Sequence, residues 1–244
     1  MSDVHPYSQN ITADPFFVFG GLFSRRVIER ELQKLSGLKP KIFSDLIEVS
    51  GRCRDEMALQ PAFESAFNGN GFKCKPTNTN HPNCDRLLGD NFLIEMKVPD
   101  GYFDPQFWKG SRKGENAVEQ LRRYLDESKV RKWGLLTNGQ VFRIMHKDCS
   151  FRFFEIWTCD SDRHGNTMQA ELFEKLLKDE GYVESLLSES VKEVNLFSEV
   201  FENHVVKFWD EFKRENDRNW NVSLVETVLT IAFYRYLEDI GVLP

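Results

Sequence analysis

The sequence predicts an α/β fold, in which one mixed sheet is flanked by helices and an all-helical connector follows. Up to about residue 158, the segments run in the order helix, strands, helix, strands, which is typical of an α/β sandwich around one sheet. After "DSDRHGN", residues 160–166, every predicted segment is helical. We therefore expect a domain of residues 1–160 and a helical connector of residues 161–244.

Two helices are expected before the first strands. Residues 24–37 carry apolar side chains at helical spacing, and residues 54–67 carry a second such stripe. "NGNG", residues 68–71, should end the second helix, because asparagine and glycine favour helix termination. Residues 73–83 are polar and contain two prolines, which indicates a loop or an edge segment.

Two strand-like runs, 84–88 and 92–98, surround the turn signal "GDN". Side chains alternate along a strand, so Glu95 and Lys97 share one face of the second run. If "GDN" forms a three-residue hairpin loop, Asp85 lies opposite Glu95. Directly opposed residues have Cβ atoms roughly 4.5–5.5 Å apart, so these two carboxylates should be close neighbours.

A third helix and three more strands should follow. Asn116 followed by Glu119 resembles a capping box, which opens a helix running to about Ser128. "KWGLLTNGQVFRIM" indicates a hairpin, because two β-rich runs flank Asn-Gly, the pair that a type I′ turn favours. "FRFFEIW", residues 151–157, should form the next strand. Beyond residue 160, helices are expected over 167–179, 182–194, 196–215 and 223–240.

Composition limits the classes of function. Hydrophobic residues make up 41% and charged residues 29% of the 244 residues, which is typical of a globular protein. No apolar run approaches the roughly 18 residues of a membrane span, and the N-terminus lacks the pattern of a signal peptide. Five cysteines without close pairing indicate reduced thiols and predict a cytoplasmic location.

The net charge of −6 argues against a surface built wholly for nucleic acid, but the charge is unevenly distributed. Residues 101–133 contain eight lysines and arginines against five acidic residues. Such a stretch can contact phosphates on an acidic protein, and affinity should then fall steeply with salt. A solvated surface is the alternative interpretation. The candidate DNA-binding residues are Lys109, Arg112, Lys113, Arg122 and Arg123.

The polar face of residues 92–98 predicts a metal-dependent phosphodiesterase centre. Two carboxylates as close as Asp85 and Glu95 repel each other unless a positive charge lies between them. A hard divalent cation satisfies that need, and Mg²⁺ typically takes one or two protein carboxylates plus phosphate and water. Lys97 would lie beside the cation, where an ammonium group can orient a water or offset transition-state charge. The alternative is a half-exposed strand whose Glu95 and Lys97 face water.

Short motifs in the correct order, between about residues 50 and 158, carry a resemblance to a known family. "DRLLGDNFLIEMK" holds Asp85, Glu95 and Lys97, and "ENAVEQLRRYLDES" holds Gln120 and Tyr124 one helical turn apart. This combination resembles the PD-(D/E)xK nucleases, in the RecB-like branch that adds a Gln-x-x-x-Tyr motif. "AVEQLRRYLDESKVRKWGLLTNGQVFRIM" is similar to the nuclease segment of type I and type IIG restriction enzymes. One departure is that "PNC", rather than a proline alone, precedes Asp85.

The resemblance implies a restriction-endonuclease-like fold and an endonuclease that depends on Mg²⁺, for which Mn²⁺ can substitute. It implies that Asp85 and Glu95 hold the metal, and that Lys97 positions the attacking water. The substrate would be double-stranded DNA, cut to leave 5′-phosphate and 3′-hydroxyl ends. The expected role is restriction of foreign DNA, as in phage defence.

The same resemblance gives roles to the helices. It implies that Gln120 and Tyr124 hold the active-site helix or a backbone phosphate. "RDEMALQPAFESAFNGNGF" is similar to the first helix of the family, whose glutamate faces the site. Glu56 is the candidate for that glutamate, and Glu64 is the alternative.

The helical tail carries a second resemblance. "LVETVLTIAFYRYLEDIGVLP", residues 224–244, is similar to the helical segment that joins nuclease and adenine methyltransferase in type IIG enzymes. The 244 residues contain no glycine-rich cofactor loop and no Asn-Pro-Pro-Tyr motif, so S-adenosylmethionine would bind only in a downstream domain. We expect the native chain to continue past Pro244 into methyltransferase and target-recognition domains. The alternatives are the nuclease end of a type I motor subunit and a non-catalytic DNA-binding or assembly module.

Overall fold

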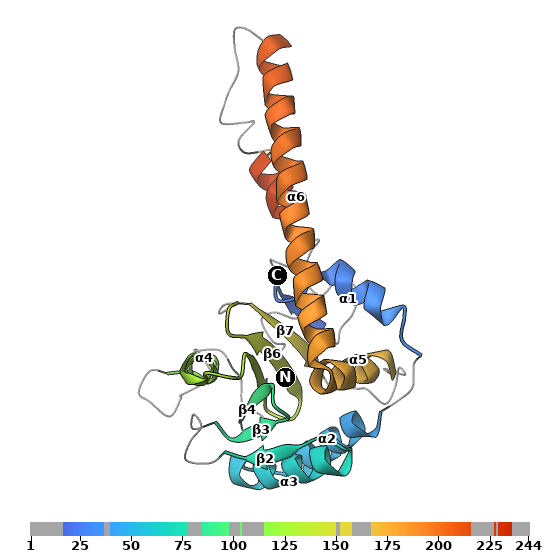
Figure 1. The fold of residues 1–244 in the computed structure, drawn as a ribbon, viewed down its shortest axis with the longest axis vertical. Helices are drawn as coiled ribbons and strands as arrows, with labels where there is room; N and C mark the ends of the chain where they lie inside the picture. Colours follow the sequence, from blue (N-terminus) through green and yellow to red (C-terminus); the bar gives the residue numbers. More distant parts are fainter. Residues whose placement is uncertain are drawn as a thin grey trace, which may run out of the picture.

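A computed structural model describes the protein over residues 17–36, 40–77, 84–97, 103, 115–149, 152–157, 167–215, 227 and 229–235. These residues form an α/β fold around one seven-stranded sheet (Figure 1). Across the sheet, the strands run in the order β1 (Phe17–Gly20), β7 (Phe153–Trp157), β6 (Val141–His146), β5 (Trp133–Thr137), β4 (Phe92–Met96), β3 (Arg86–Leu88) and β2 (Cys74–Pro76). Strands β4 and β5 are parallel and the other neighbouring pairs are antiparallel, which confirms the predicted mixed sheet.

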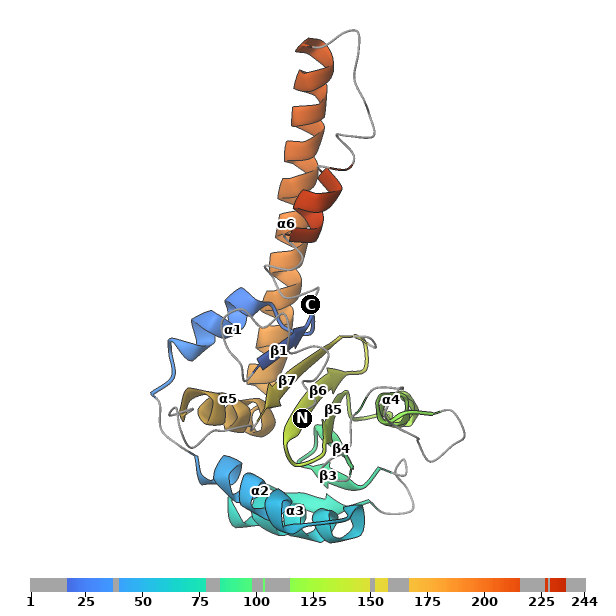
Figure 2. The same ribbon diagram turned by 180° about the vertical axis from the view of Figure 1, so that it is seen from behind.

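Helices cover both faces of this sheet (Figure 2). One face carries the larger hydrophobic cluster, which is packed by α1 (Arg25–Leu32), α2 (Lys41–Arg52), α3 (Glu56–Gly69), α5 (Thr167–Lys178) and the start of α6 (Glu180–Glu215). The opposite face is covered by α4 (Ala117–Glu127), which packs in a second cluster. Strand β4 contributes Ile94 to the first cluster and Leu93 to the second, so it is buried on both faces.

Two local signals of the sequence, the capping box and the three-residue hairpin loop, are found where they were predicted. The Asn116 side chain accepts the N–H of Glu119 (3.0 Å), and the Glu119 carboxylate accepts the N–H of Asn116 (2.9 Å), which confirms the capping box. Strands β3 and β4 pair in the register that a three-residue loop requires, with Leu88 opposite Phe92. Gly89 adopts a φ of 58° in that loop, a conformation that glycine accepts readily.

The structure contains two elements that were not predicted, and it joins two of the predicted helices into a single helix. Strand β1 and helix α2 are additional, although α2 has Ile42 and Leu46 buried at helical spacing. The helices expected over 182–194 and 196–215 form the single 36-residue α6, because no glycine or proline interrupts the chain between them. Of the helix expected over 223–240, the described residues 227 and 229–235 are helical.

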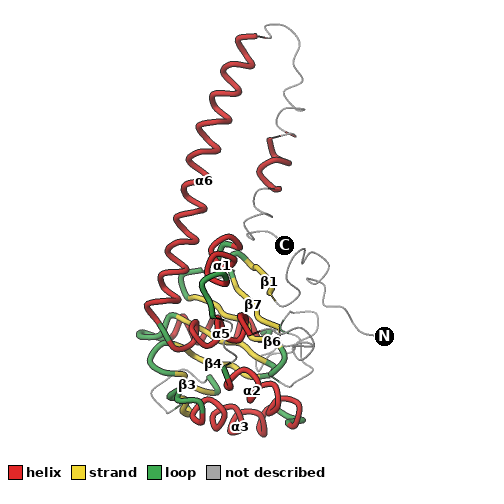
Figure 3. The backbone as a smooth tube through the Cα atoms, turned by 90° about the vertical axis from the view of Figure 1, so that its right-hand side faces the viewer, coloured by secondary structure: helices red, strands yellow, loops and turns green. Residues whose placement is uncertain are grey.

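The hydrophobic core continues across residue 160. Helix α5 and the first turns of α6 bury Phe173, Leu176 and Leu186 in the same cluster as the sheet. Beyond that contact, α6 extends away from the sheet as one helix (Figure 3). Among the described residues, no helix is both long and apolar enough to cross a membrane.

Strands β5 and β6 form the predicted hairpin, but the turn differs from the two-residue type I′ turn that was expected. Thr137 pairs with Phe142, so residues 138–140 and Val141, the first residue of β6, lie between the last paired positions. The Asn138 side chain accepts the N–H groups of Gln140 (3.0 Å) and Val141 (2.9 Å). Asparagine closes the wider loop through its own side chain, a property that also favours it in other turns.

The β5–β6 loop lies against α2 at a glycine, and this contact predicts a stability effect. Gly139 has a φ of 86°, and a Cβ placed there would lie 2.2 Å from Cβ of Ser50. Gly139→Ala should destabilise the fold by about 1–3 kcal/mol, because it adds a clash and a strained backbone. Urea unfolding followed by circular dichroism measures the change.

Gly51→Ala is the matched control for this prediction. Gly51 lies in α2 next to Ser50, and a Cβ there would meet nothing within 4 Å. Alanine should stabilise the helix by roughly 0.5–1 kcal/mol. Equal stability of Gly139→Ala and the wild-type protein would contradict the close contact between the loop and α2.

Candidate metal centre

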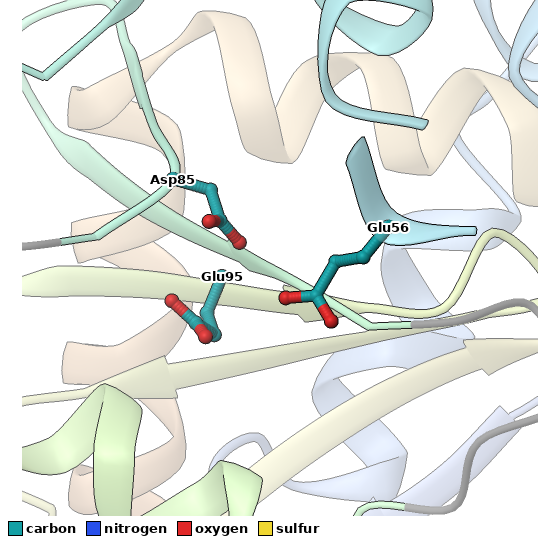
Figure 4. Close-up of side chains that lie close together, drawn as sticks. All are labelled: Glu56, Asp85 and Glu95. Carbon is teal, nitrogen blue, oxygen red and sulfur yellow. The ribbon is translucent and has the colours of Figure 1, made fainter. Parts of the chain in front are cut away.

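Three carboxylates from separate elements converge near the C-terminal end of β4. Glu56 is the first residue of α3, Asp85 immediately precedes β3, and Glu95 lies in β4. One carboxylate oxygen from each residue lies within 4.8 Å of those of the other two. Figure 4 shows the three side chains close together, each coming from a different part of the chain. Oxygen atoms arranged in this way can bind one cation together.

Backbone pairing brings Asp85 next to Glu95. The Asp85 N–H donates to the carbonyl oxygen of Ile94 (3.1 Å), which extends the contact between the two strands past Arg86. The Asp85 carboxylate accepts the N–H of Met96 through Oδ2 (2.7 Å). The close approach of the two acidic residues, which the hairpin register predicted, is therefore present.

Helix α3 adds the third carboxylate at its first turn. Asp55 is the N-cap, and its side chain accepts the N–H of Ala58 (2.7 Å), which fixes the start of the helix. Glu56 follows directly and its side chain is 35% exposed, whereas that of Glu95 is 2% exposed. The cluster is therefore accessible to solvent from the side of Glu56.

Lys97 lies beside the carboxylates on the same side of the chain as Glu95. Its Nζ is 2.5 Å from Oε1 of Glu95 and 3.7 Å from Oε1 of Glu56. The backbone N–H of Lys97 donates to the carbonyl oxygen of Thr137 (2.8 Å), so the backbone pairing with β5 continues as far as Lys97. Glu95 is 1% and Lys97 5% exposed, which rules out a half-exposed strand whose charges face water.

Helix α4, which covers the face of the sheet opposite α3, supports Lys97. Oε1 of Gln120 accepts a hydrogen bond from Nζ of Lys97 (3.0 Å). Nε2 of Gln120 donates to the hydroxyl of Tyr124 (2.9 Å), and both side chains are buried. Six predicted site residues therefore lie in one connected cluster: Glu56, Asp85, Glu95, Lys97, Gln120 and Tyr124.

Burial makes the full negative charge of this cluster unfavourable. Burial and the charge of Asp85 raise the pKa of Glu95 to about 8. Burial raises the pKa of Asp85 to about 6, although the Met96 N–H opposes the shift. Burial lowers the pKa of Lys97, but the charge and hydrogen bond of Glu95, together with the charges of Glu56 and Asp85, outweigh burial, so the pKa is raised overall. When ionised, three carboxylates and one ammonium group leave two negative charges, which one divalent cation would neutralise.

The residues present fit a hard divalent cation. Oε2 of Glu95 is buried and accepts no hydrogen bond from the residues that the structure describes. A buried carboxylate oxygen without a partner is costly in free energy, and a cation would supply that partner. Ligands that are all oxygen suit Mg²⁺ and Mn²⁺.

Glu64, the alternative to Glu56, lies outside this cluster because its Oε2 pairs with Nε of Arg86 (2.8 Å). Sequence reasoning missed the roles of two residues at the centre. Gln60 donates through Nε2 to Oδ1 of Asp85 (2.6 Å), and Arg86 donates through Nη1 to Oε1 of Gln60 (3.2 Å). The position of Gln60 one helical turn after Glu56, on the same face of the helix, is the sequence feature from which its role could have been predicted.

The predicted DNA-binding residues are placed only in part. Lys109, Arg112 and Lys113 lie outside the described residues. Arg122 and Arg123 are partly buried on α4. The Arg123 guanidinium donates to both carboxylate oxygens of Glu115 (2.9 and 3.2 Å) and lies 4.6 Å from the centre of the Tyr124 ring, so its charge is largely compensated. DNA binding by these five residues stays a prediction.

The raised pKa values predict that metal binding releases protons. Near neutral pH the metal-free centre holds protons on Glu95 and, in part, on Asp85, whereas a cation binds the ionised forms. The apparent affinity for Mn²⁺ should therefore rise as the pH increases through about 6 and about 8. Calorimetric titration in two buffers of different ionisation enthalpy counts the protons, and Glu95→Gln should release fewer. An affinity independent of pH over this range would contradict the raised pKa values.

Comparisons with family models, with curated proteins and with solved structures found no match to this chain. The functional conclusion therefore depends on the geometry of the centre. That geometry consists of three converging carboxylates, an ammonium group beside them, and the two side chains of α4 that hold the ammonium group.

Proposed function

We propose that the protein is a Mg²⁺-dependent DNA endonuclease of the PD-(D/E)xK type, with a restriction-endonuclease-like fold. The observation that carries the proposal is the cluster of Glu56, Asp85 and Glu95, with Nζ of Lys97 2.5 Å from Glu95. Phosphodiester hydrolysis needs a positioned water and positive charge beside the phosphoryl oxygens. A cation site with an adjacent ammonium group meets both needs.

The contacts of each residue support a specific role. Glu56, Asp85 and Glu95 would hold the cation, which when bound polarises the phosphate and lowers the pKa of a bound water. Lys97 keeps its proton beside Glu95 and can donate to a water or to a phosphate oxygen. Gln120 accepts a hydrogen bond from Nζ and so fixes the direction of the ammonium group.

We further propose double-stranded DNA as the substrate and restriction of foreign DNA as the biological role. The order of the sequence motifs and the basic stretch of residues 101–133 support this part of the proposal. Mn²⁺ should substitute for Mg²⁺, because both prefer oxygen ligands. A cytoplasmic location and a downstream methyltransferase that binds S-adenosylmethionine, with a target-recognition domain, belong to the same proposal.

Removing a charge from the centre should abolish cleavage. Asp85→Ala, Glu95→Ala and Lys97→Ala should each slow the nicking of supercoiled plasmid by at least roughly 100-fold, because each removes a ligand or the transition-state cation. The assay compares rates with Mg²⁺, with Mn²⁺ and with a chelator. DNA binding by the wild-type protein without nicking in either metal would favour the non-catalytic module.

The controls remove the same charges from the surface. Glu48 and Lys41 on α2 are exposed and lie outside the basic stretch, so Glu48→Ala and Lys41→Ala should cut as the wild-type protein does. Circular dichroism of all five variants shows whether the fold is intact. Full nicking activity in Glu95→Ala would overturn the proposed function.

Removing the support of Lys97 should have a smaller effect. Gln120→Ala should lower the rate of cleavage by roughly 10–100-fold, the usual effect of losing a residue that orients a functional group. DNA binding should change little, because Gln120 is buried. Rate and affinity are measured separately, by single-turnover cleavage and by fluorescence anisotropy in Ca²⁺. A loss of affinity with an unchanged rate would place Gln120 in substrate binding instead.

A further inference from the structure

Asp85 is held by a side chain to which the proposed mechanism gives no role. Gln60, on α3 one turn after Glu56, donates through Nε2 to Oδ1 of Asp85 (2.6 Å). The N–H of Met96 donates to the other oxygen, Oδ2 (2.7 Å). One donor on each oxygen fixes the plane of the carboxylate, and each oxygen keeps a further lone pair that can bind a cation.

Gln60 is itself oriented by an arginine. Arg86 donates through Nη1 to Oε1 of Gln60 (3.2 Å) and to the carbonyl oxygen of Asp85 (2.7 Å). Because Oε1 faces this donor, Nε2 faces Asp85, and a flipped amide would lose both contacts. Nε of Arg86 pairs with Oε2 of Glu64 (2.8 Å), which lies one turn beyond Gln60 on α3. The four residues therefore form one connected network between α3 and the start of β3, in which Glu64 contacts Arg86 as an ion pair.

We propose that Gln60 is a positioning residue for the metal centre, and that Arg86 and Glu64 act through it to hold the Asp85 carboxylate toward the cation. This inference rests on the proposed function, because it assumes that Asp85 is a metal ligand. It also gives a role to Glu64, the acidic residue of α3 that lies outside the carboxylate cluster.

Two physical arguments support this role. Asp85 lies just outside β3, and the terminal torsion of an aspartate is broad, so hydrogen bonds rather than strand pairing set the direction of its oxygens. Gln60 is neutral, so it donates to Asp85 without placing a positive charge beside the cation. The charge of Arg86 is compensated by Glu64. Side chains that orient a metal ligand in this way are typically as important for affinity as for activity.

The test is calorimetric titration of Mn²⁺ into the purified protein. Gln60→Met keeps the length of the side chain and removes both hydrogen bonds, so Mn²⁺ affinity should fall roughly 10–100-fold. Glu64→Gln should cause a smaller loss. The double variant should bind no more weakly than Gln60→Met alone, because Glu64 acts through Gln60. Gln33→Met, at the exposed end of α1, is the matched control and should bind as the wild-type protein does.

A second measurement separates positioning from ligation. In cleavage assays, saturating Mn²⁺ should restore the maximal rate of Gln60→Met, whereas Asp85→Ala should stay inactive at any concentration. Unchanged Mn²⁺ affinity in a folded Gln60→Met would overturn the inference, and so would fully additive losses in the double variant.

The same titration distinguishes the failure of this inference from the failure of the proposed function. A wild-type protein that binds Mn²⁺ but cuts no DNA would overturn the nuclease, while a weakened Gln60→Met would still support the positioning role. A wild-type protein that binds no Mn²⁺ would overturn both.

Discussion

The candidate site depends on a buried pair of a carboxyl group and an ammonium group in a central strand of the sheet. Glu95 and Lys97 are both buried, so ionising both groups costs several kcal/mol per ion even after relaxation, and burial accordingly raises the pKa of Glu95 to about 8. Their 2.5 Å contact offsets part of that cost. Asp85 and Glu56 then add negative charge that one ammonium group cannot neutralise. The metal-free fold therefore bears an electrostatic cost at this point, which is a common property of functional sites.

The layered fold allows side chains from both faces of the sheet to meet around this pair. Helix α3 packs in the larger cluster through Leu59 and Phe63 and presents its polar residues at the end of β4. Helix α4 packs on the opposite face, close to β5 at Gly134, where a Cβ would lie 2.9 Å from the side chain of Leu121. This close approach brings the neighbouring Gln120 within hydrogen-bonding distance of Lys97.

The start of the helical region belongs to the same packed body as the sheet. The indole N–H of Trp133 in β5 donates to Glu184 of α6 (2.9 Å), and the N–H of Ser24 donates to the hydroxyl of Ser190 (2.9 Å). Apolar residues of α5 and of the first turns of α6 complete the larger cluster. The sequence changes to helix near residue 160, but the packing of the core does not end there.

The sequence by itself determined the features that depend on neighbours along the chain. The capping box of α4, the alternation that places Glu95 and Lys97 together, and the register that brings Asp85 to Glu95 follow from short-range hydrogen bonds and strand geometry. Only the tertiary structure decided which turn of α3 faces the strands. It thereby distinguished Glu56 from Glu64 and showed the contact of Gln60 with Asp85. Helical periodicity defines a face but not its partner, which is set by packing between residues distant in the sequence.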